Sequence, residues 1–130
     1  MSNPCLTDKN GTIANPQIPR YEKKGLLLWK NNNITNFPKG TQIKLANNNY
    51  DLIIWIFSTS VIGSNSNLVS SNLKGNNCIL NGATVSSNIS VRRQLTYVDD
   101  TTYRAENGYG NSGVDDNNAI PVMAIGFTLS

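Results

Sequence analysis

The chain contains no histidine, and this absence removes a large part of enzyme chemistry. The common nucleophilic hydrolases need an imidazole base, and most zinc sites use histidine or clustered cysteine. Cysteine is also scarce: Cys5 and Cys78 lie too far apart in the sequence for a metal-binding motif. We expect two ordinary thiols there, with a bridge between them as the alternative. The composition therefore predicts no bound metal and no other cofactor.

Charge and long apolar runs are scarce as well. Charged residues make up 15% of the 130 residues, the net charge is +3, and the adjacent basic pairs are Lys23-Lys24 and Arg92-Arg93. Nucleic-acid binding through phosphates needs a longer basic stripe, so we predict no nucleic-acid partner. No run approaches the ~18 apolar residues of a membrane helix, and the polar start lacks a secretory signal pattern. We expect no membrane insertion, and we expect the chain to be synthesised in a cytoplasm.

Residues 50–59 form the strongest apolar segment, and turn-forming residues flank it. Its β-branched and aromatic residues favour a strand. One face of this strand would carry Leu52, Ile54 and Ile56, and the other would carry Ile53, Trp55 and Phe57. A strand that is apolar on both faces must be covered on both faces. In a chain this short, we expect another subunit to supply the second cover and assign Ile53, Trp55 and Phe57 to that interface.

The remaining sequence predicts an antiparallel β-sandwich or a jelly roll. Strands are expected at residues 25–30, 41–46, 88–98, 101–106 and 119–129, the last again apolar on both faces. Residues 63–75 predict a long loop or a weak edge strand. Asn81-Gly82 is the strongest hairpin signal in the chain. No helical periodicity interrupts this series, so we predict one all-β domain at residues 25–130, preceded by an extended arm at residues 1–24.

Arg93 conflicts with the pattern of its own strand. Strict alternation places it on the apolar face with Val91 and Leu95. A buried arginine needs a carboxylate or carbonyl acceptors, and Glu106 and Asp51 are candidate partners. The alternative is a β-bulge that turns the side chain outward. We include Arg93 among the candidate residues of the subunit interface.

Two motifs have chemical meanings that their surroundings do not support. Residues 108–113 match G-x-G-x-x-G, but no helix follows to bind a pyrophosphate, so a glycine-permitted flexible loop is the better interpretation.

Asp99-Asp100 and Asp115-Asp116 are acidic pairs. A glycosidase needs two carboxyls facing each other at roughly 5–9 Å, whereas adjacent aspartates in polar loops are usually solvated turn formers. A calcium site at Asp115 and Asp116 is the minor alternative. The sequence predicts no enzyme.

Sugar binding needs an aromatic ring to stack on a pyranose and polar side chains to bond its hydroxyls. The segment 107–118 and the turn at residues 99–100 could present such a set, because binding residues are common on loops of rigid scaffolds. The ordinary alternative is a half-buried tyrosine and a simple connecting loop. The candidate glycan-binding residues are Tyr103, Asn107, Tyr109, Asn111, Asp115 and Asn117.

The order of short motifs resembles a known group of proteins. The matching segments are GLLLW (25–29), TQIKLA (41–46), YDLIIWIF (50–57), VRRQLTY (91–97), ENGYG (106–110) and IPVMAIGF (120–127). They resemble the small C-terminal β-domains of tail-fibre, baseplate and receptor-binding virion proteins from phages and prophages of low-GC Gram-positive bacteria. The resemblance implies a trimeric β-sandwich in the virion, which attaches to surface glycans or caps a fibre.

Other functions stay open at this point. A structural virion protein, such as a head-fibre, decoration or baseplate subunit, would bind another virion protein and no sugar. A glycan depolymerase would need facing carboxylates. A small phage-encoded inhibitor would more often be a monomer or dimer. The family usually places this domain at the end of a long fibre, whereas this chain begins with only a short arm.

Overall fold

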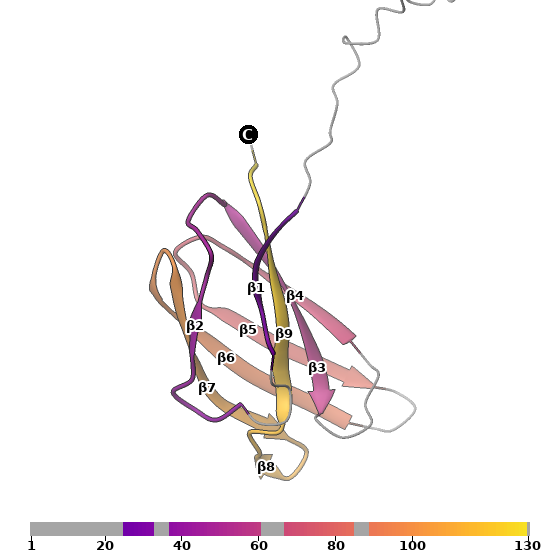
Figure 1. Ribbon diagram of the computed structural model, residues 1–130. Helices are drawn as coiled ribbons and strands as arrows, with labels where there is room; N and C mark the ends of the chain where they lie inside the picture. Colours follow the sequence, from indigo (N-terminus) through magenta and orange to yellow (C-terminus); the bar gives the residue numbers. More distant parts are fainter. Residues whose placement is uncertain (1–24, 33–36, 61–66, 85–88, 130) are drawn as a thin grey trace, which may run out of the picture.

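The structure is a computed structural model that describes residues 25–32, 37–60, 67–84 and 89–129 (Figure 1). Regular structure in these ranges consists of strands, as the sequence predicts. The strands are β1 (Leu26–Lys30), β2 (Gln42–Lys44), β3 (Leu52–Ser60), β4 (Asn67–Leu73), β5 (Cys78–Thr84), β6 (Ile89–Asp99), β7 (Thr102–Gly110), β8 (Gly113–Val114) and β9 (Asn118–Phe127). Within the described part of the chain, no helix is long and apolar enough to cross a lipid bilayer. The expected arm at residues 1–24 lies outside the described residues.

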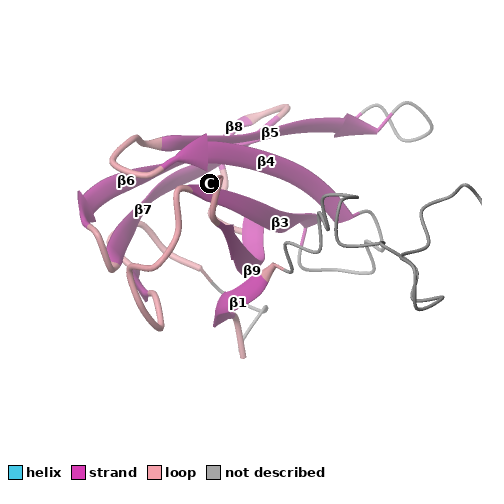
Figure 2. Cartoon of the chain, turned by 90° about the horizontal axis from the view of Figure 1, so that it is seen from above, coloured by secondary structure: helices cyan, strands magenta, loops and turns pink. Residues whose placement is uncertain are grey.

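The strands form two antiparallel sheets that share one core. One sheet has the order β1-β9-β3-β4, and the other has the order β2-β7-β6-β5 with β8 paired to β7. The second order is of the Greek-key kind, because β5, β6 and β7 are consecutive neighbours and β2 joins them beside β7. Figure 2 shows β1 and β5 on opposite sides of the molecule, with β4 next to β5. The arrangement is sandwich-like, with side chains of both sheets in the core.

The central strand β3 has one fully buried face and one partly exposed face. Ile53, Trp55 and Phe57 are each 0% exposed, and they point into the core between the two sheets. Arg93 is also 0% exposed within the single chain. These four side chains are therefore covered by their own chain, which corrects their assignment to a subunit interface: a second subunit could touch only the other face of β3.

A proline lies in the interior of the sheet, where it needs a special arrangement. Pro121 belongs to β9, which pairs with β1 on one side and β3 on the other. A proline cannot donate to the ladder, so within a sheet it is confined to strand starts, edges and bulges, and Pro121 lies beyond the residues of β9 that pair with β1. The register between β3 and β9 shifts between Ile56 and Phe57, which leaves Val122 as the extra residue. The bulge thus explains how the Ile-Pro segment forms a central strand.

The strongest hairpin signal in the sequence is not a hairpin. Asn81 and Gly82 lie inside the continuous strand β5, where they pair with Arg92 and Val91 of β6. A Cβ atom on Gly82 would lie 2.0 Å from the Leu68 side chain of β4. The glycine therefore makes room for the Leu68 side chain between the sheets and does not form a turn. The weak segment before it forms edge strand β4, which confirms the second of the two expectations for residues 63–75.

Candidate functional site

The segment that connects β7 to β9 is built around Arg93. Its guanidinium donates from Nε to the Ala119 carbonyl oxygen at 2.9 Å and from Nη1 to the Glu106 carbonyl oxygen at 2.7 Å. Nη2 donates to the carbonyl oxygens of Asp116 at 2.8 Å and Asn118 at 3.0 Å. Four backbone acceptors therefore satisfy this buried group, as a fully buried arginine requires.

The contacts settle the alternatives for Arg93. The side chain points inward, and Glu106 is a partner through its backbone carbonyl. Asp51 lies elsewhere, where its carboxylate accepts a hydrogen bond from the Leu129 N–H at 2.8 Å. Burial lowers the pKa of the Arg93 guanidinium, and the carboxylates of Asp116 and Asp115 oppose that shift, so the group stays charged at neutral pH. The guanidinium also lies over the Phe37 ring, 5.4 Å from its centroid.

Gly108 allows this close arrangement. A Cβ atom there would lie 2.6 Å from the carbonyl oxygens of Asn118 and Asp115 and 2.7 Å from Nη2 of Arg93. The first glycine of the G-x-G-x-x-G match is therefore a packing residue, and the flexible loop that the sequence suggested is wrong for residues 108–110, which continue strand β7.

The carboxylate of Asp116 fixes the same segment from the other side. It accepts hydrogen bonds from the Gly108 N–H at 2.8 Å, the Asn107 amide at 3.2 Å and the Lys39 N–H at 3.3 Å. Burial raises the pKa of Asp116, but these hydrogen bonds and the charge of Arg93 outweigh burial, so the pKa lies below its usual value. Asn107, predicted to contact a ligand, instead positions Asp116.

Four of the predicted glycan-binding residues lie on the surface of this end. Tyr109 is 38% exposed, with the Arg92 guanidinium 5.4 Å from the centroid of its ring. Asn111, Asp115 and Asn117 are exposed. The Asn111 side-chain oxygen accepts from the Ser90 N–H at 2.8 Å, and Asp115 accepts from the Asn117 N–H at 3.0 Å. The structure brings these residues to one end, which we call the β7–β9 end.

Tyr103 does not belong to that surface. It is 0% exposed and packs edge-on against Trp55 and Tyr97, with ring centroids 5.3 and 5.7 Å away. Its hydroxyl accepts from the Asn72 amide at 2.8 Å. Its ring therefore cannot stack on a sugar, and the assignment of Tyr103 to a glycan site is wrong. Tyr103 shares the inward face of β7 with Ala105, which is also 0% exposed.

The turn at residues 99–100 lies at the opposite end of the molecule from the segment 107–118 (Figure 1). Asp100 and Asn107, the nearest residues of the two segments, are seven residues apart, mostly along the extended strand β7, or roughly 23 Å at 3.3 Å per residue. The two segments therefore cannot form one binding site. For the same reason, Asp99-Asp100 cannot face Asp115-Asp116 at the spacing of a glycosidase.

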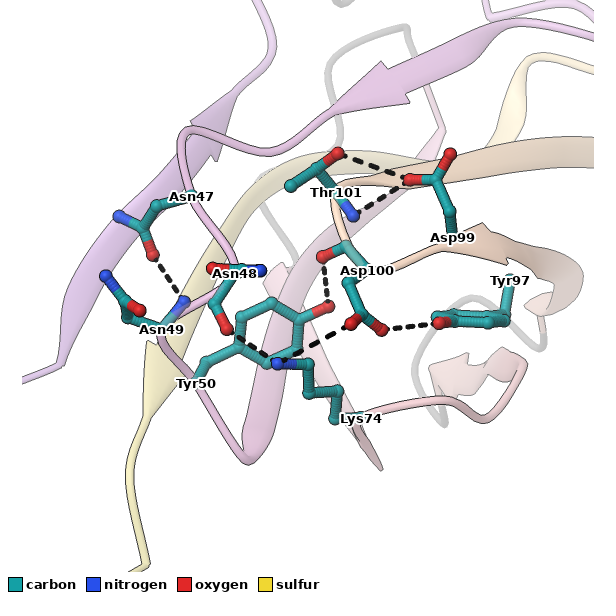
Figure 3. Close-up of polar contacts among 9 residues, drawn as sticks. All are labelled: Asn47, Asn48, Asn49, Tyr50, Lys74, Tyr97, Asp99, Asp100 and Thr101. Carbon is teal, nitrogen blue, oxygen red and sulfur yellow. Dashed lines mark hydrogen bonds and ion pairs between the residues drawn. The ribbon is translucent and has the colours of Figure 1, made fainter.

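The turn is part of a second polar cluster, which sequence reasoning missed (Figure 3). Lys74 connects three loops: its Nζ donates to the Asn48 carbonyl oxygen at 2.7 Å and lies 3.9 Å from the Asp100 carboxylate. The same ammonium is 5.1 Å from the centroid of the Tyr50 ring. The Tyr50 hydroxyl donates to the Asp100 carbonyl oxygen at 2.8 Å. No sequence signal joins these residues, because they come from separate connections between strands.

Hydrogen bonding also fixes the acidic side chains of this cluster. The Tyr97 hydroxyl donates to the Asp100 carboxylate, and this bond is the main reason that the pKa of Tyr97 rises to about 12. Asp99 accepts from the Thr101 N–H at 3.0 Å, which lowers the pKa of Asp99. Asp99 therefore stabilises its own turn, as the sequence predicts for adjacent aspartates in a polar loop, whereas Asp100 also contacts Lys74 from another loop.

The described residues hold no group of three or more histidine, cysteine, aspartate or glutamate side chains that could bind a metal ion. Cys78 is free and buried, and burial raises the pKa of its thiol to about 12. Cys5 lies outside the described residues.

No protein-family model, no curated protein and no solved structure matches this chain.

Proposed function

We propose that this chain is a non-catalytic virion component of a bacteriophage, a fibre-tip or receptor-binding domain that attaches to host surface glycans. The observation that carries the proposal is the construction of the β7–β9 end. A buried guanidinium and a partly buried, hydrogen-bonded carboxylate fix its backbone, and an exposed tyrosine ring and three polar side chains extend from it. Fixed loops bind with less loss of conformational freedom than mobile ones.

The chemistry of this end suits a saccharide. The Arg92 guanidinium lies over the Tyr109 ring, so the exposed part of the ring would contact the C–H groups of a pyranose while the guanidinium donates hydrogen bonds to its hydroxyls. Asn111, Asp115 and Asn117 offer amide and carboxylate groups to hydroxyls. Such a site binds without cleaving, so the proposal includes no catalytic step and no cofactor. It places the protein in the virion, made in the cytoplasm of the bacterial host.

The test is retention of the purified chain on cell walls of low-GC Gram-positive bacteria. Tyr109→Ala should weaken retention about tenfold or more, whereas Tyr109→Phe keeps the ring and should retain most of it. Asn117→Ala should weaken it, and Asn49→Ala, an exposed asparagine at the opposite end, is the matched control. Binding that Tyr109→Ala and Asn117→Ala leave unchanged would remove the proposed site.

A structural virion subunit without sugar binding is the second candidate, and a different observation favours it. The outer face of the β1-β9-β3-β4 sheet carries exposed apolar side chains, including Val69 at 62% and Leu27 at 55%. Such a face is typical of protein–protein contact. This candidate predicts self-association, or binding to another virion protein, together with no retention on any cell wall.

We also propose a homotrimer with a jelly-roll-like fold. The pairs β1–β9 and β2–β7 join distant parts of the chain, as a wrapped jelly roll requires, whereas β3–β4 and β5–β6 are pairs of consecutive strands within one sheet. The apolar second face of β3 supports self-association. Light scattering behind a sizing column tests the trimer, which predicts a mass near three chains.

A further inference from the structure

The two sheets have outer faces of opposite character. Cross-strand partners lie on the same face, so the register defines rows of side chains across each sheet. Across the β1-β9-β3-β4 sheet, the outer rows are Leu73, Leu52 and Phe127; Ser71, Ile54, Ile125 and Leu27; and Val69, Ile56, Met123 and Lys30. Nine of these eleven positions are apolar, and the two polar ones lie on the edge strands β1 and β4. We call these nine residues the apolar face.

The other outer face is mostly polar. Its rows include Arg104 between Gln42 and Thr96, and Arg92 between Asn81 and Tyr109. Ile79, 46% exposed, pairs with Gln94 there. Side chains of this face also bond one another: the Thr96 hydroxyl donates to the Glu106 carboxylate at 2.7 Å, and Arg104 approaches the same carboxylate at 3.2 Å. This polar outer face can therefore remain exposed to solvent, whereas exposure of the apolar face to solvent is unfavourable.

Within the described residues, the chain leaves the apolar face open to solvent. Val69, Leu27 and Leu73 are 62%, 55% and 51% exposed, and the central residues of the face are partly exposed. Burying one aliphatic side chain removes on the order of 60–120 Å² of apolar surface, so nine partly exposed ones leave on the order of 400 Å². An apolar patch of this size is often an interaction site.

We infer that the apolar face is buried against further copies of this chain. A protein interface is about 60% apolar, so an apolar centre of about 400 Å² with its polar rim reaches about 700 Å² per partner. A standard interface buries about 800 Å² per partner, which makes the face large enough for stable self-association. Sheets stack face to face through such apolar surfaces in sandwiches, and the same packing can join subunits. The inference rests on the self-association proposed above but not on glycan binding.

A pair of matched variants tests it. Val69→Lys places a charge on the apolar face, and Ile79→Lys places one on the polar outer face; both residues are exposed β-branched strand residues. We expect the wild-type chain and Ile79→Lys to have the mass of an oligomer by light scattering, and Val69→Lys to have the mass of one chain. Near-ultraviolet circular dichroism, which senses the buried Trp55, checks that each variant is folded.

The outcomes separate this inference from the functional proposal. A wild-type mass of one chain overturns it and leaves residues 1–24 or a different protein as the cover. An oligomer that Val69→Lys leaves intact overturns it as well, because the copies would then meet elsewhere. A wild-type mass of two chains that Val69→Lys reduces to one supports the face and contradicts the trimer. Loss of cell-wall retention on Tyr109→Ala bears on the glycan site and leaves this inference unchanged.

Discussion

Nε of Arg93 donates to the carbonyl oxygen of Ala119, which has a φ of 50°. Few residues other than glycine adopt this left-handed conformation, because Cβ approaches the backbone. Ala119 begins the buried run of β9 and is itself buried. The guanidinium thus stabilises the left-handed backbone conformation of Ala119 at the start of β9. It also connects the core to the candidate binding surface at the β7–β9 end.

We predict that Arg93→Met lowers the free energy of unfolding by about 2–4 kcal/mol, because the carbonyl oxygens that Arg93 satisfies lose their donor. Urea unfolding followed by tryptophan fluorescence measures it. Arg92→Met, at the exposed neighbouring position, is the control and should change stability by no more than about 0.5 kcal/mol. Equal effects of the two substitutions would mean that Arg93 does not hold the segment.

We predict that Asn72→Ala costs about 2–3 kcal/mol, because Asn72 connects two buried aromatic residues. Its side-chain oxygen accepts from Nε1 of Trp55 at 2.7 Å, and its amide donates to the Tyr103 hydroxyl at 2.8 Å. Without it, both polar groups remain buried and lose a partner. Asn76→Ala leaves the Asn76 carbonyl in place, so it should have little effect in the same unfolding experiment.

The fold was largely predictable from the sequence because it rests on local patterns. The strands at residues 25–30, 50–59, 88–98 and 119–129 were predicted close to their positions, since apolar alternation and flanking turn residues mark them. The hairpin at Asn81-Gly82 was wrong for a reason that no local pattern contains. Gly82 serves the contact with Leu68, which only the packing of the two sheets reveals.

The candidate site was less predictable, because it depends on contacts between distant residues. Alternation correctly placed Arg93 inside, but it could not choose carbonyl acceptors over carboxylates. Sequence proximity joined residues 99–100 to the segment 107–118, which β7 holds apart. The prediction for Ile53, Trp55 and Phe57 failed for a different reason. The sequence pattern correctly indicates two apolar faces on this strand, but it does not indicate which face is buried within the chain itself.

We predict that Asp116→Asn lowers stability at neutral pH by about 1–2 kcal/mol and that the difference disappears in acid. The pKa of Asp116 is lowered in the folded chain, so its contribution is present above the unfolded value near 3.9 and is lost as pH falls through the folded pKa. Unfolding midpoints of wild type and Asp116→Asn should therefore differ at pH 7 and converge in acid, once the pH lies below the lowered pKa of Asp116. Asp115→Asn, at an exposed neighbouring position, should lower stability at pH 7 by less than Asp116→Asn does. A difference that persists in acid would show that the carboxylate charge is not the cause.

We predict that alkaline pH unfolds the chain through its tyrosines. The pKa of Tyr50 is raised mainly by burial, the pKa of Tyr103 is raised by burial, and the pKa of Tyr97 is raised to about 12 by its hydrogen bond to Asp100. A raised folded pKa means that stability is complete below the unfolded value near 10 and is lost as pH rises toward 12.

Absorbance at 295 nm and circular dichroism, recorded together during an alkaline titration, check this prediction. Much of the tyrosinate signal should appear only as the structure is lost, because Tyr50 and Tyr103 ionise readily only after they leave the core. Tyr97→Phe should remove one late-titrating group while the other two still couple ionisation to unfolding. Complete ionisation of a chain that keeps its near-ultraviolet circular dichroism would mean that these rings are accessible in the folded state, which their packing contradicts.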